Sequence, residues 1–264
     1  APAGFTFSLS STATALTLTA AVNNNEAFWT GSGGTSWTAT NFGTNATAAA
    51  SIAGSSLNAT RDVRFAATGA GNLTTTLGGN YTINTLTVST PGVSIGGANT
   101  LTANASSATA FNVSAANGTT VISANLAGAN AGLSKSGAGT LTLNGTNTFG
   151  GGLTLSAGTL NLNSATAPGN GTLTITGGTI DNTSGGTVTL SNNNAQNWNG
   201  DFAFTGTNNL HMGNGTVTLA ASRSVTVNGG TLTVGGAISG SGFGDRKSTR
   251  LNSSHTVTRM PSSA

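Results

Sequence analysis

The sequence predicts an all-β protein, and more narrowly a β-solenoid, from three observations. Short segments such as TLTLNG (140–145) and TLTVGG (231–236) alternate apolar and polar residues, which is the pattern of a half-buried strand. Glycine and asparagine bound these segments, and both tolerate the backbone angles of tight turns. No segment shows the periodicity, length and caps of a helix.

The predicted strands follow one another along most of the chain. Leucine, valine and isoleucine are expected to point inward and threonine outward. The 40 glycines, 49 threonines and 31 asparagines suit short strands joined by turns. In chain order, the strands are expected at ALTLTA (15–20), TLTVST (85–90), TLTLNG (140–145), LTLSAG (153–158), TLNLNS (159–164), TLTITGG (172–178), TVTLSN (187–192), TVTLAA (216–221), SVTVNGG (224–230) and TLTVGG (231–236).

Two architectures fit such a series: an antiparallel sandwich or barrel, and a solenoid whose coils stack about 4.8 Å apart. Local self-similarity favours the solenoid, because repetition of one short unit is its mark. We expect unpaired strand edges at both ends of the stack and, through them, self-association. Outward Thr-x-Thr pairs vary in spacing along the sequence, so we do not expect the flat, regular ladder that ice binding needs.

Charge is unevenly distributed. The net charge is +3, yet residues 1–244 hold four basic and four acidic side chains, so the excess lies in residues 245–264. A nucleic-acid surface needs clustered Lys and Arg, and we predict no nucleic-acid partner. Cysteine is absent, which permits either a reducing compartment or export of an unfolded chain.

The last twenty residues differ from the rest of the chain. Translated back into codons, DRKSTRLNSSH and RMPSSA resemble a common short-read sequencing adapter in one frame. We therefore predict that residues 245–264 are a non-native artefact, the alternative being a genuine basic tail. The segment before them, GAISGSGFG (236–244), resembles the lead-in to a further copy of the motif at 132–162 described next.

One segment, GLSKSGAGTLTLNGTNTFGGGLTLSAGTLNL (132–162), carries a specific motif. It resembles the autotransporter-associated β-strand repeat, also called the passenger-associated transport repeat. Gly150 departs from the family pattern, which usually has threonine after the aromatic residue, and we expect this change to be harmless. Segments 28–43 and 197–219 resemble further parts of such proteins. The matching residues are Leu133, Lys135, Gly137, Gly139, Thr140, Leu141, Leu143, Gly145, Asn147, Phe149, Gly151, Gly152, Gly158, Thr159 and Leu160.

The resemblance implies a right-handed parallel β-helix in the exported passenger of a bacterial autotransporter-like protein. It implies a structural stalk or scaffold, secreted or held at the cell surface, whose stacking aids its own export across the outer membrane. Two alternatives stay open: an adhesin that binds surface glycans or host and matrix proteins, and a polysaccharide-degrading β-helical enzyme. Whether an outer-membrane β-barrel translocator follows in the parent protein is also left open.

The chain is expected to divide into four parts. Residues 1–25 are predicted to be trailing strands of a preceding unit, and residues 26–131 a solenoid with an aromatic-rich start. Residues 132–244 are predicted to be a solenoid that contains the repeat at 132–162 and a degenerate second part, followed by the artefact at 245–264.

Asp181 and Asp201 are the one acidic pair that could support glycoside hydrolysis. Their separation of twenty residues is close to one coil, so they could lie on adjacent coils about 5 Å apart, as in a retaining glycosidase. TIDN and NGDF are also ordinary turn contexts, in which aspartate caps a backbone bend. We favour the turn role and predict that the protein has no catalytic residues and is not an enzyme.

We also predict no metal-binding or cofactor-binding residues. His211 is the one histidine before residue 245, and without cysteine it cannot form a conventional zinc site. GLSKSGAG (132–139) has a Lys-Ser pair but lacks the glycine that precedes the lysine in a phosphate-binding loop. Trp29, Trp37 and Phe42 could form a sugar-stacking platform, but we expect them in the core or in an end cap.

Overall fold

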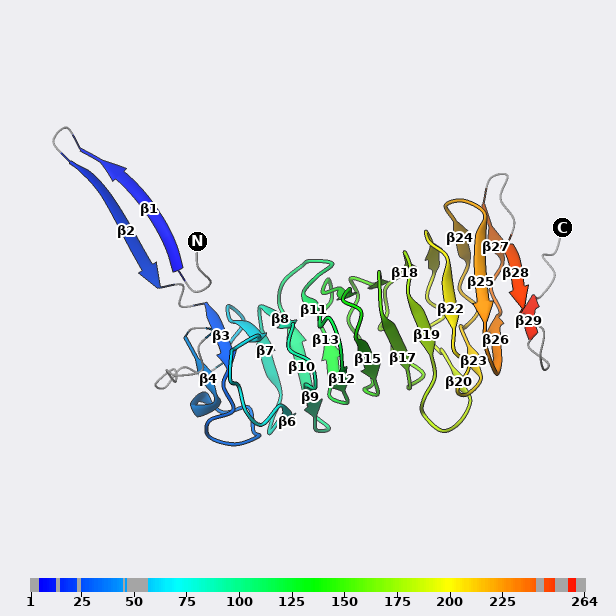
Figure 1. The fold of residues 1–264 in the computed structure, drawn as a ribbon, viewed down its shortest axis with the longest axis horizontal. Helices are drawn as coiled ribbons and strands as arrows, with labels where there is room; N and C mark the ends of the chain where they lie inside the picture. Colours follow the sequence, from blue (N-terminus) through cyan, green and yellow to red (C-terminus); the bar gives the residue numbers. More distant parts are fainter. Residues whose placement is uncertain are drawn as a thin grey trace.

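The structure is a computed structural model that describes residues 5–12, 15–22, 25–44, 46, 57–240, 245–249 and 256–259. In these parts the chain is almost entirely β-structure, with one 3-10 turn, η1 (Ala39–Asn41). Successive coils stack along the long axis of the molecule (Figure 1). The prediction of an all-β solenoid with parallel strands is confirmed. No helix in the described ranges is long and apolar enough to cross a membrane.

Three faces surround the core, and a complete coil contributes one strand to each face. The first face is an 11-stranded sheet of β3 (Glu26–Trp29), β4 (Phe42–Gly43), β5 (Asp62–Phe65), β8 (Thr85–Val88), β11 (Phe111–Val113), β14 (Leu133–Lys135), β16 (Leu153–Leu155), β18 (Leu173–Ile175), β21 (Gln196–Trp198), β24 (Val217–Leu219) and β27 (Ile238–Ser239). The second face is a 9-stranded sheet of β6 (Thr74–Thr76), β9 (Ser94–Gly96), β12 (Thr119–Ile122), β15 (Thr140–Leu143), β17 (Thr159–Leu162), β19 (Thr179–Asp181), β22 (Phe202–Phe204), β25 (Arg223–Val227) and β28 (Asp245–Thr249).

The third face is interrupted. It has a 3-stranded sheet of β7 (Tyr81–Ile83), β10 (Thr100–Ala103) and β13 (Asn125–Ala127), and a 4-stranded sheet of β20 (Val188–Thr189), β23 (Leu210–His211), β26 (Thr231–Val234) and β29 (Thr256–Arg259). No strand of the third face is described between β13 and β20. The repeat at 132–162 lies in this interval. On its coils, other contacts must therefore replace the third strand.

The alternation of the sequence sets the core. In β8, β10 and β26 the leucine, valine and alanine positions are buried and the threonine positions are half-buried. The inward side chains of all three faces form one continuous hydrophobic cluster. In these three strands the predicted orientation of apolar and threonine residues is confirmed, whereas Thr75, Thr120 and Thr142 are buried.

The outward residues of the first face form an uninterrupted polar row, which we call the outer row. Coil length varies, since Leu133 pairs with Leu153 but Leu86 pairs with Phe111. The extra residues of the longer coils lie in the corners between strands. Each coil therefore places one outward residue at the same position of the first face. Because the row mixes Thr, Asn and Ser, it is not the Thr-x-Thr ladder that ice binding needs. The outer row consists of Thr87, Asn112, Ser134, Thr154, Thr174, Asn197, Thr218 and Ser239.

The N-terminal end of the stack is capped, contrary to the expectation of open edges at both ends. On the first face β4 pairs antiparallel with β3, and on the second face Trp37 N donates to Thr76 O at 3.2 Å. Trp29 packs edge-on against Phe42 at 5.2 Å and stacks on Phe65 at 5.5 Å. These contacts cover the edges of β3 and β6 and fill the first coil with aromatic rings.

Before this cap, β1 (Phe5–Ser11) and β2 (Leu16–Val22) form an antiparallel hairpin. The hairpin pairs with no described strand of the solenoid and extends away from it in Figure 1. The predicted strand ALTLTA (15–20) corresponds to β2. The assignment of residues 1–25 to a preceding unit stays a prediction.

At the other end, β28 and β29 add parallel strands to the second and third faces. Their register sets Lys247 opposite Val225 and Arg259 opposite Val234, and both valines are buried in the core. Residues 241–244, 250–255 and 260–264, which complete the predicted repeat start and the predicted artefact, lie outside the described residues.

Removing the cap is expected to destabilise the first coils. Trp37 is 1% exposed and its Nε1 donates to Thr75 Oγ1 at 2.9 Å, so Trp37→Ala should cost about 3–5 kcal/mol of unfolding free energy. Urea unfolding measures the loss, and hydrogen exchange should show it first in β3 to β6, because each coil contacts only its neighbours. Ser36→Ala, an exposed neighbour, is the control. Equal unfolding midpoints for the two variants would contradict the assignment of Trp37 to a cap.

Candidate functional site

The repeat at 132–162 places a lysine in the core. Lys135 ends β14 and pairs with Val113 on the preceding coil and Leu155 on the following one. Those two side chains and Lys135 point inward, and Lys135 is 1% exposed. A charged residue at such a position must find partners for its ammonium group inside the protein.

Backbone carbonyls supply these partners. Lys135 Nζ donates to Gly137 O at 2.6 Å and to Ala157 O at 3.0 Å, with Ser136 O at 3.4 Å. Ser136 and Gly137 belong to the corner that follows β14, and Ala157 belongs to the same corner one coil later. The ammonium therefore fastens two successive coils together. Burial lowers the pKa of Lys135 from its ordinary value of 10.5 to about 8.

Glycines make this corner possible. Gly158 has φ +71°, and a Cβ there would lie 2.6 Å from Lys135 Nζ. At Gly137 a Cβ would overlap the carbonyl oxygens of Ser114 and Ala115 on the preceding coil. Both glycines let the backbones of adjacent coils approach until their carbonyls surround the amine. This geometry suits a coil-to-coil fastening and leaves the amine no access to solvent.

Asn147 replaces the missing strand of the third face. Its Oδ1 accepts from Leu126 N at 2.9 Å and its Nδ2 donates to Ala167 O at 2.8 Å. One buried side chain thus connects the coils on either side, as a strand's backbone would. Phe149 follows it into the core and packs against Phe111 at 6.0 Å.

Gly150 is not a neutral departure from the family pattern. A Cβ at this position would overlap Ala129 O on the preceding coil, and Gly150 N already donates to Gly128 O at 2.9 Å. The expectation that glycine in place of the usual threonine is harmless understates its role. In this chain the close approach of the two coils requires glycine.

The structure does not bring Asp181 and Asp201 together. Thr179 pairs with Ala203, which sets Asp181 opposite Thr205, four residues beyond Asp201 and about 13 Å along the strand direction. The hypothesis of a glycosidase-like pair about 5 Å apart is therefore wrong.

Both carboxylates instead hold corners, in agreement with the favoured turn role. Asp181 is 4% exposed and accepts from Asn182 N at 2.8 Å, Thr207 N at 3.0 Å and Thr207 Oγ1 at 2.6 Å. Asp201 accepts from Ser224 N at 2.9 Å on the next coil and lies 3.9 Å from Arg223. Each aspartate thus connects its own coil to the following one.

The aromatic residues near the start are buried. Trp29, Trp37 and Phe42 are at most 1% exposed, so they form the cap and core that we favoured, and the sugar-stacking platform is wrong. His211 accepts from Gly213 N at 3.0 Å through Nδ1. No group of three metal-ligating side chains occurs among the described residues.

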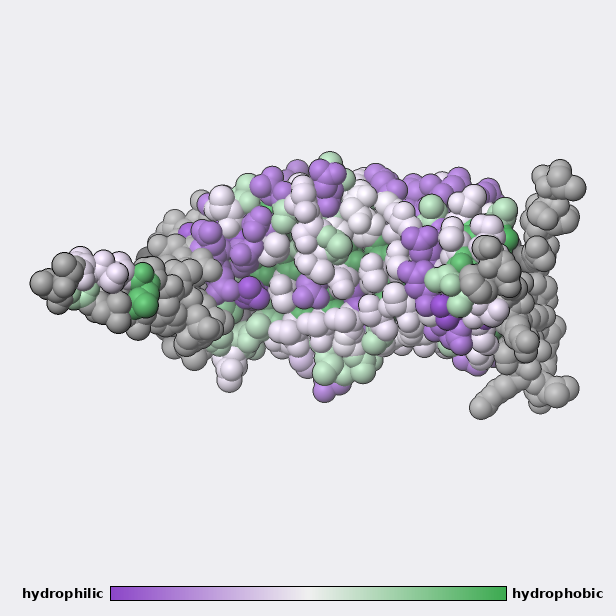
Figure 2. Space-filling model, turned by 90° about the horizontal axis from the view of Figure 1, so that it is seen from above, coloured by the Kyte–Doolittle hydropathy of each residue, from purple (hydrophilic) through white to green (hydrophobic). Residues whose placement is uncertain are grey.

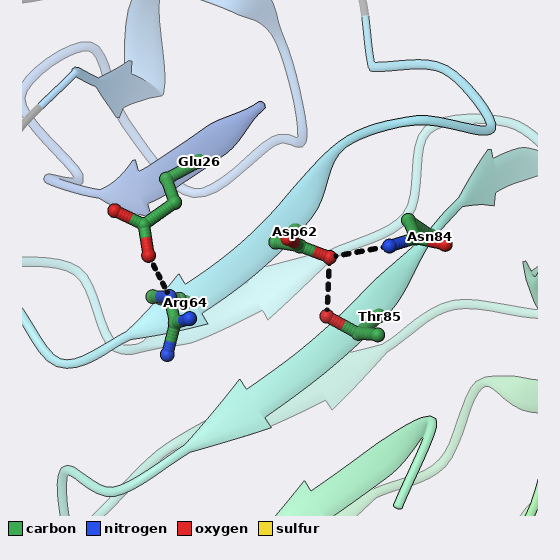
Figure 3. A network of polar contacts seen from close by, with 5 residues as sticks. All are labelled: Glu26, Asp62, Arg64, Asn84 and Thr85. Atoms are coloured by element: carbon green, nitrogen blue, oxygen red, sulfur yellow. Dashed lines mark hydrogen bonds and ion pairs between the residues drawn. The ribbon is translucent and has the colours of Figure 1, made fainter. Parts of the chain in front are cut away.

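Sequence reasoning missed a charged network on the first coils (Figure 3). Arg64 Nε lies 2.9 Å from Glu26 Oε1, and Asp62 Oδ1 accepts from Asn84 Nδ2 at 2.8 Å and Thr85 Oγ1 at 2.7 Å. These side chains come from or adjoin β3, β5 and β8, three consecutive strands of the first face. Only the register between coils brings them together, although the opposite charges in NEAF and RDVR were a signal.

Comparison with known families agrees with this geometry. The family described as passenger-associated-transport-repeat matches residues 133–162. No curated protein and no solved structure matches the chain. The matched repeat and the solenoid fit a passenger-like structural domain of an autotransporter, a family that implies export to the cell surface or beyond.

Lys135→Met should remove a pH dependence of stability. Because burial lowers the pKa of Lys135 from 10.5 to about 8, the unfolded chain binds more protons than the folded chain between these values. The unfolding free energy of the wild type should therefore rise with pH across this window relative to the variant, and this gain should vanish as the pH falls through about 8. Urea unfolding of both proteins, from below pH 8 to above pH 10.5, measures the difference. A difference that is flat across the window would contradict the prediction.

Gly150→Thr, which restores the residue usual in the family, should destabilise this chain. The new Cβ overlaps Ala129 O, so adjacent coils must separate at an expected cost of about 1–3 kcal/mol. Gly78→Thr is the matched control, because a Cβ at Gly78 meets no atom within 4 Å. Thermal unfolding compares the two variants. An equal or higher midpoint for the Gly150 variant would contradict the prediction that glycine is required at this position.

Proposed function

We propose that the chain is part of the passenger of a bacterial autotransporter-like protein, where it acts as a structural stalk or scaffold. The observation that carries the proposal is the repeat at 133–162, whose signature residues make the contacts between coils. A solenoid built this way extends by adding coils and needs no chemistry of its own. The proposed location is the bacterial cell surface or the medium outside it.

The same stacking supports a role in export. A coil that leaves the membrane can pair with the coil already outside and bury its apolar side chains there. Folding outside would then oppose return of the chain. Lys135 and Asn147 contribute, because each makes hydrogen bonds to a neighbouring coil.

Each of the two alternatives, the enzyme and the adhesin, loses one feature that could have supported it. For a polysaccharide-degrading enzyme, the separation of Asp181 from Asp201 removes the carboxylate pair on which that hypothesis rested. For an adhesin, the aromatic residues around Trp29 that could have formed a sugar-stacking surface are buried. An adhesin must therefore use another surface.

Surface display tests the proposal. The full chain is placed between a signal sequence and the translocator of a Gram-negative autotransporter in place of the host passenger. We expect the chain to reach the surface of intact cells, as detected by antibody and by removal with external protease. Gly150→Thr should lower the surface amount several-fold through its loss of stability, whereas Gly78→Thr should not. Failure of the wild-type chain to reach the surface, while the host passenger does, would overturn the proposal.

A further inference from the structure

Asparagine is followed directly by glycine at six places in the described chain. In such a pair the backbone nitrogen of the glycine can attack the side-chain amide carbon of the asparagine, because glycine has no Cβ to obstruct the approach. The attack needs an amide side chain that is free to turn and a glycine N–H that is open to solvent. The six pairs begin at Asn117, Asn144, Asn170, Asn199, Asn214 and Asn228.

Neighbouring coils hold the asparagine side chain in two of these pairs. Asn144 Nδ2 donates to Ser123 Oγ at 3.0 Å, and Asn144 Oδ1 accepts from Asn163 Nδ2 at 3.1 Å. Asn170 likewise uses both ends of its amide in hydrogen bonds to neighbouring coils. A side chain that is fixed at both ends cannot turn its amide carbon toward the next backbone nitrogen.

In three further pairs the glycine is poorly accessible. Gly200 N donates to Ile175 O at 3.0 Å, so the attacking nitrogen is engaged. Gly215 is buried and Gly229 is half-buried. Solvent therefore has restricted access to the backbone nitrogen at which the reaction would start.

The remaining pair, Asn117 and Gly118, is held in neither way. Within the described chain the Asn117 side chain makes no hydrogen bond and Gly118 N donates none. Both residues are exposed, which is true of no other Asn-Gly pair. This pair alone combines a free side chain with a fully accessible backbone nitrogen.

The register between coils explains this exposure. β11 pairs with β14 and β12 pairs with β15, but the corner between β11 and β12 has five residues (114–118), whereas the corner between β14 and β15 has four (136–139). The two corners start and end at paired residues, so the longer one has to place its extra residue outward. Residues 116–119 are accordingly all exposed.

We propose that Asn117 is a site of spontaneous deamidation, at which the solenoid modifies itself without an enzyme. Gly118 N loses its proton to solvent and bonds to Asn117 Cγ, and the Cγ–Nδ2 bond breaks with release of ammonia. Water then opens the cyclic succinimide at either carbonyl. Attack of water on Cγ gives aspartate, and attack on the backbone carbonyl carbon gives isoaspartate, in which the chain runs through the side chain.

The product would carry a charge where the surface has none. Between Arg64 and Asp181 the sequence contains one charged residue, Lys135, and its side chain is buried. Weakly polar, pale residues predominate between separate hydrophilic patches in the view of Figure 2. A carboxyl group with an ordinary pKa of about 4 is ionised at neutral pH, so deamidation adds a negative charge to these coils. The reaction depends on the corner alone and is independent of the proposed function.

Incubation of the purified full chain at mildly alkaline pH tests the proposal, with peptide mapping by mass spectrometry to follow each pair. Conversion at Asn117 should be several-fold faster than at Asn144 and Asn170. It should accelerate as the pH rises, because the attacking nitrogen must lose its proton. In water labelled with heavy oxygen, aspartate and isoaspartate should each take up one labelled atom.

The same incubation in guanidinium chloride separates the effect of structure from that of sequence. Without hydrogen bonds between coils, Asn117, Asn144 and Asn170 should convert at similar rates. In the folded chain Asn117→Gln should abolish the fast conversion, because the longer side chain cannot close the same ring, whereas Asn144→Gln should leave it intact. Melting temperatures verify that both variants are folded. Conversion at Asn117 no faster than at Asn144 in the folded chain, or the same preference in guanidinium chloride, would overturn the proposal.

Discussion

Hydrogen bonding between successive coils is the constraint on which this structure depends. A single coil cannot bury its apolar side chains, so each coil is stable only through its neighbours. The pairing of Leu153 with Leu133 on one side and Leu173 on the other shows the register that the whole first face keeps. A slip by one residue would turn every leucine outward, which is why extra residues accumulate in corners and never within strands.

The corners then have to bring backbones unusually close, and the repeat supplies the means. Glycine at 137 and 158 removes the side chains that would keep two corners apart. The approach gathers carbonyl oxygens that have no strand partner, and Lys135 satisfies them with its ammonium group. A cation in the core is tolerable here because the coils hold these carbonyl oxygens in place around the ammonium group.

The sequence alone was sufficient for the strands that alternate over four or more residues, such as TLTLNG, which contains β15. It was insufficient for β23, because a strand of two residues shows no alternation, and β20 covers only two residues of the predicted strand TVTLSN (187–192). The network of Glu26 with Arg64 depends on register and could not be derived from spacing. Spacing also misled at Asp181 and Asp201, because the coil from Thr179 to Ala203 has 24 residues, so a separation of twenty does not place two residues side by side.

Lys247, near the end of the described chain, has a register position similar to that of Lys135. Lys135 and Lys247 each lie opposite a buried valine of the preceding coil, Val113 and Val225. Lys135 is accommodated because a glycine two residues later lets the corner fold back over its amine. The residue two places after Lys247 is Thr249, so the glycine that accommodates Lys135 has no counterpart there in the sequence. The assignment of residues 245–264 to a non-native artefact stays a prediction.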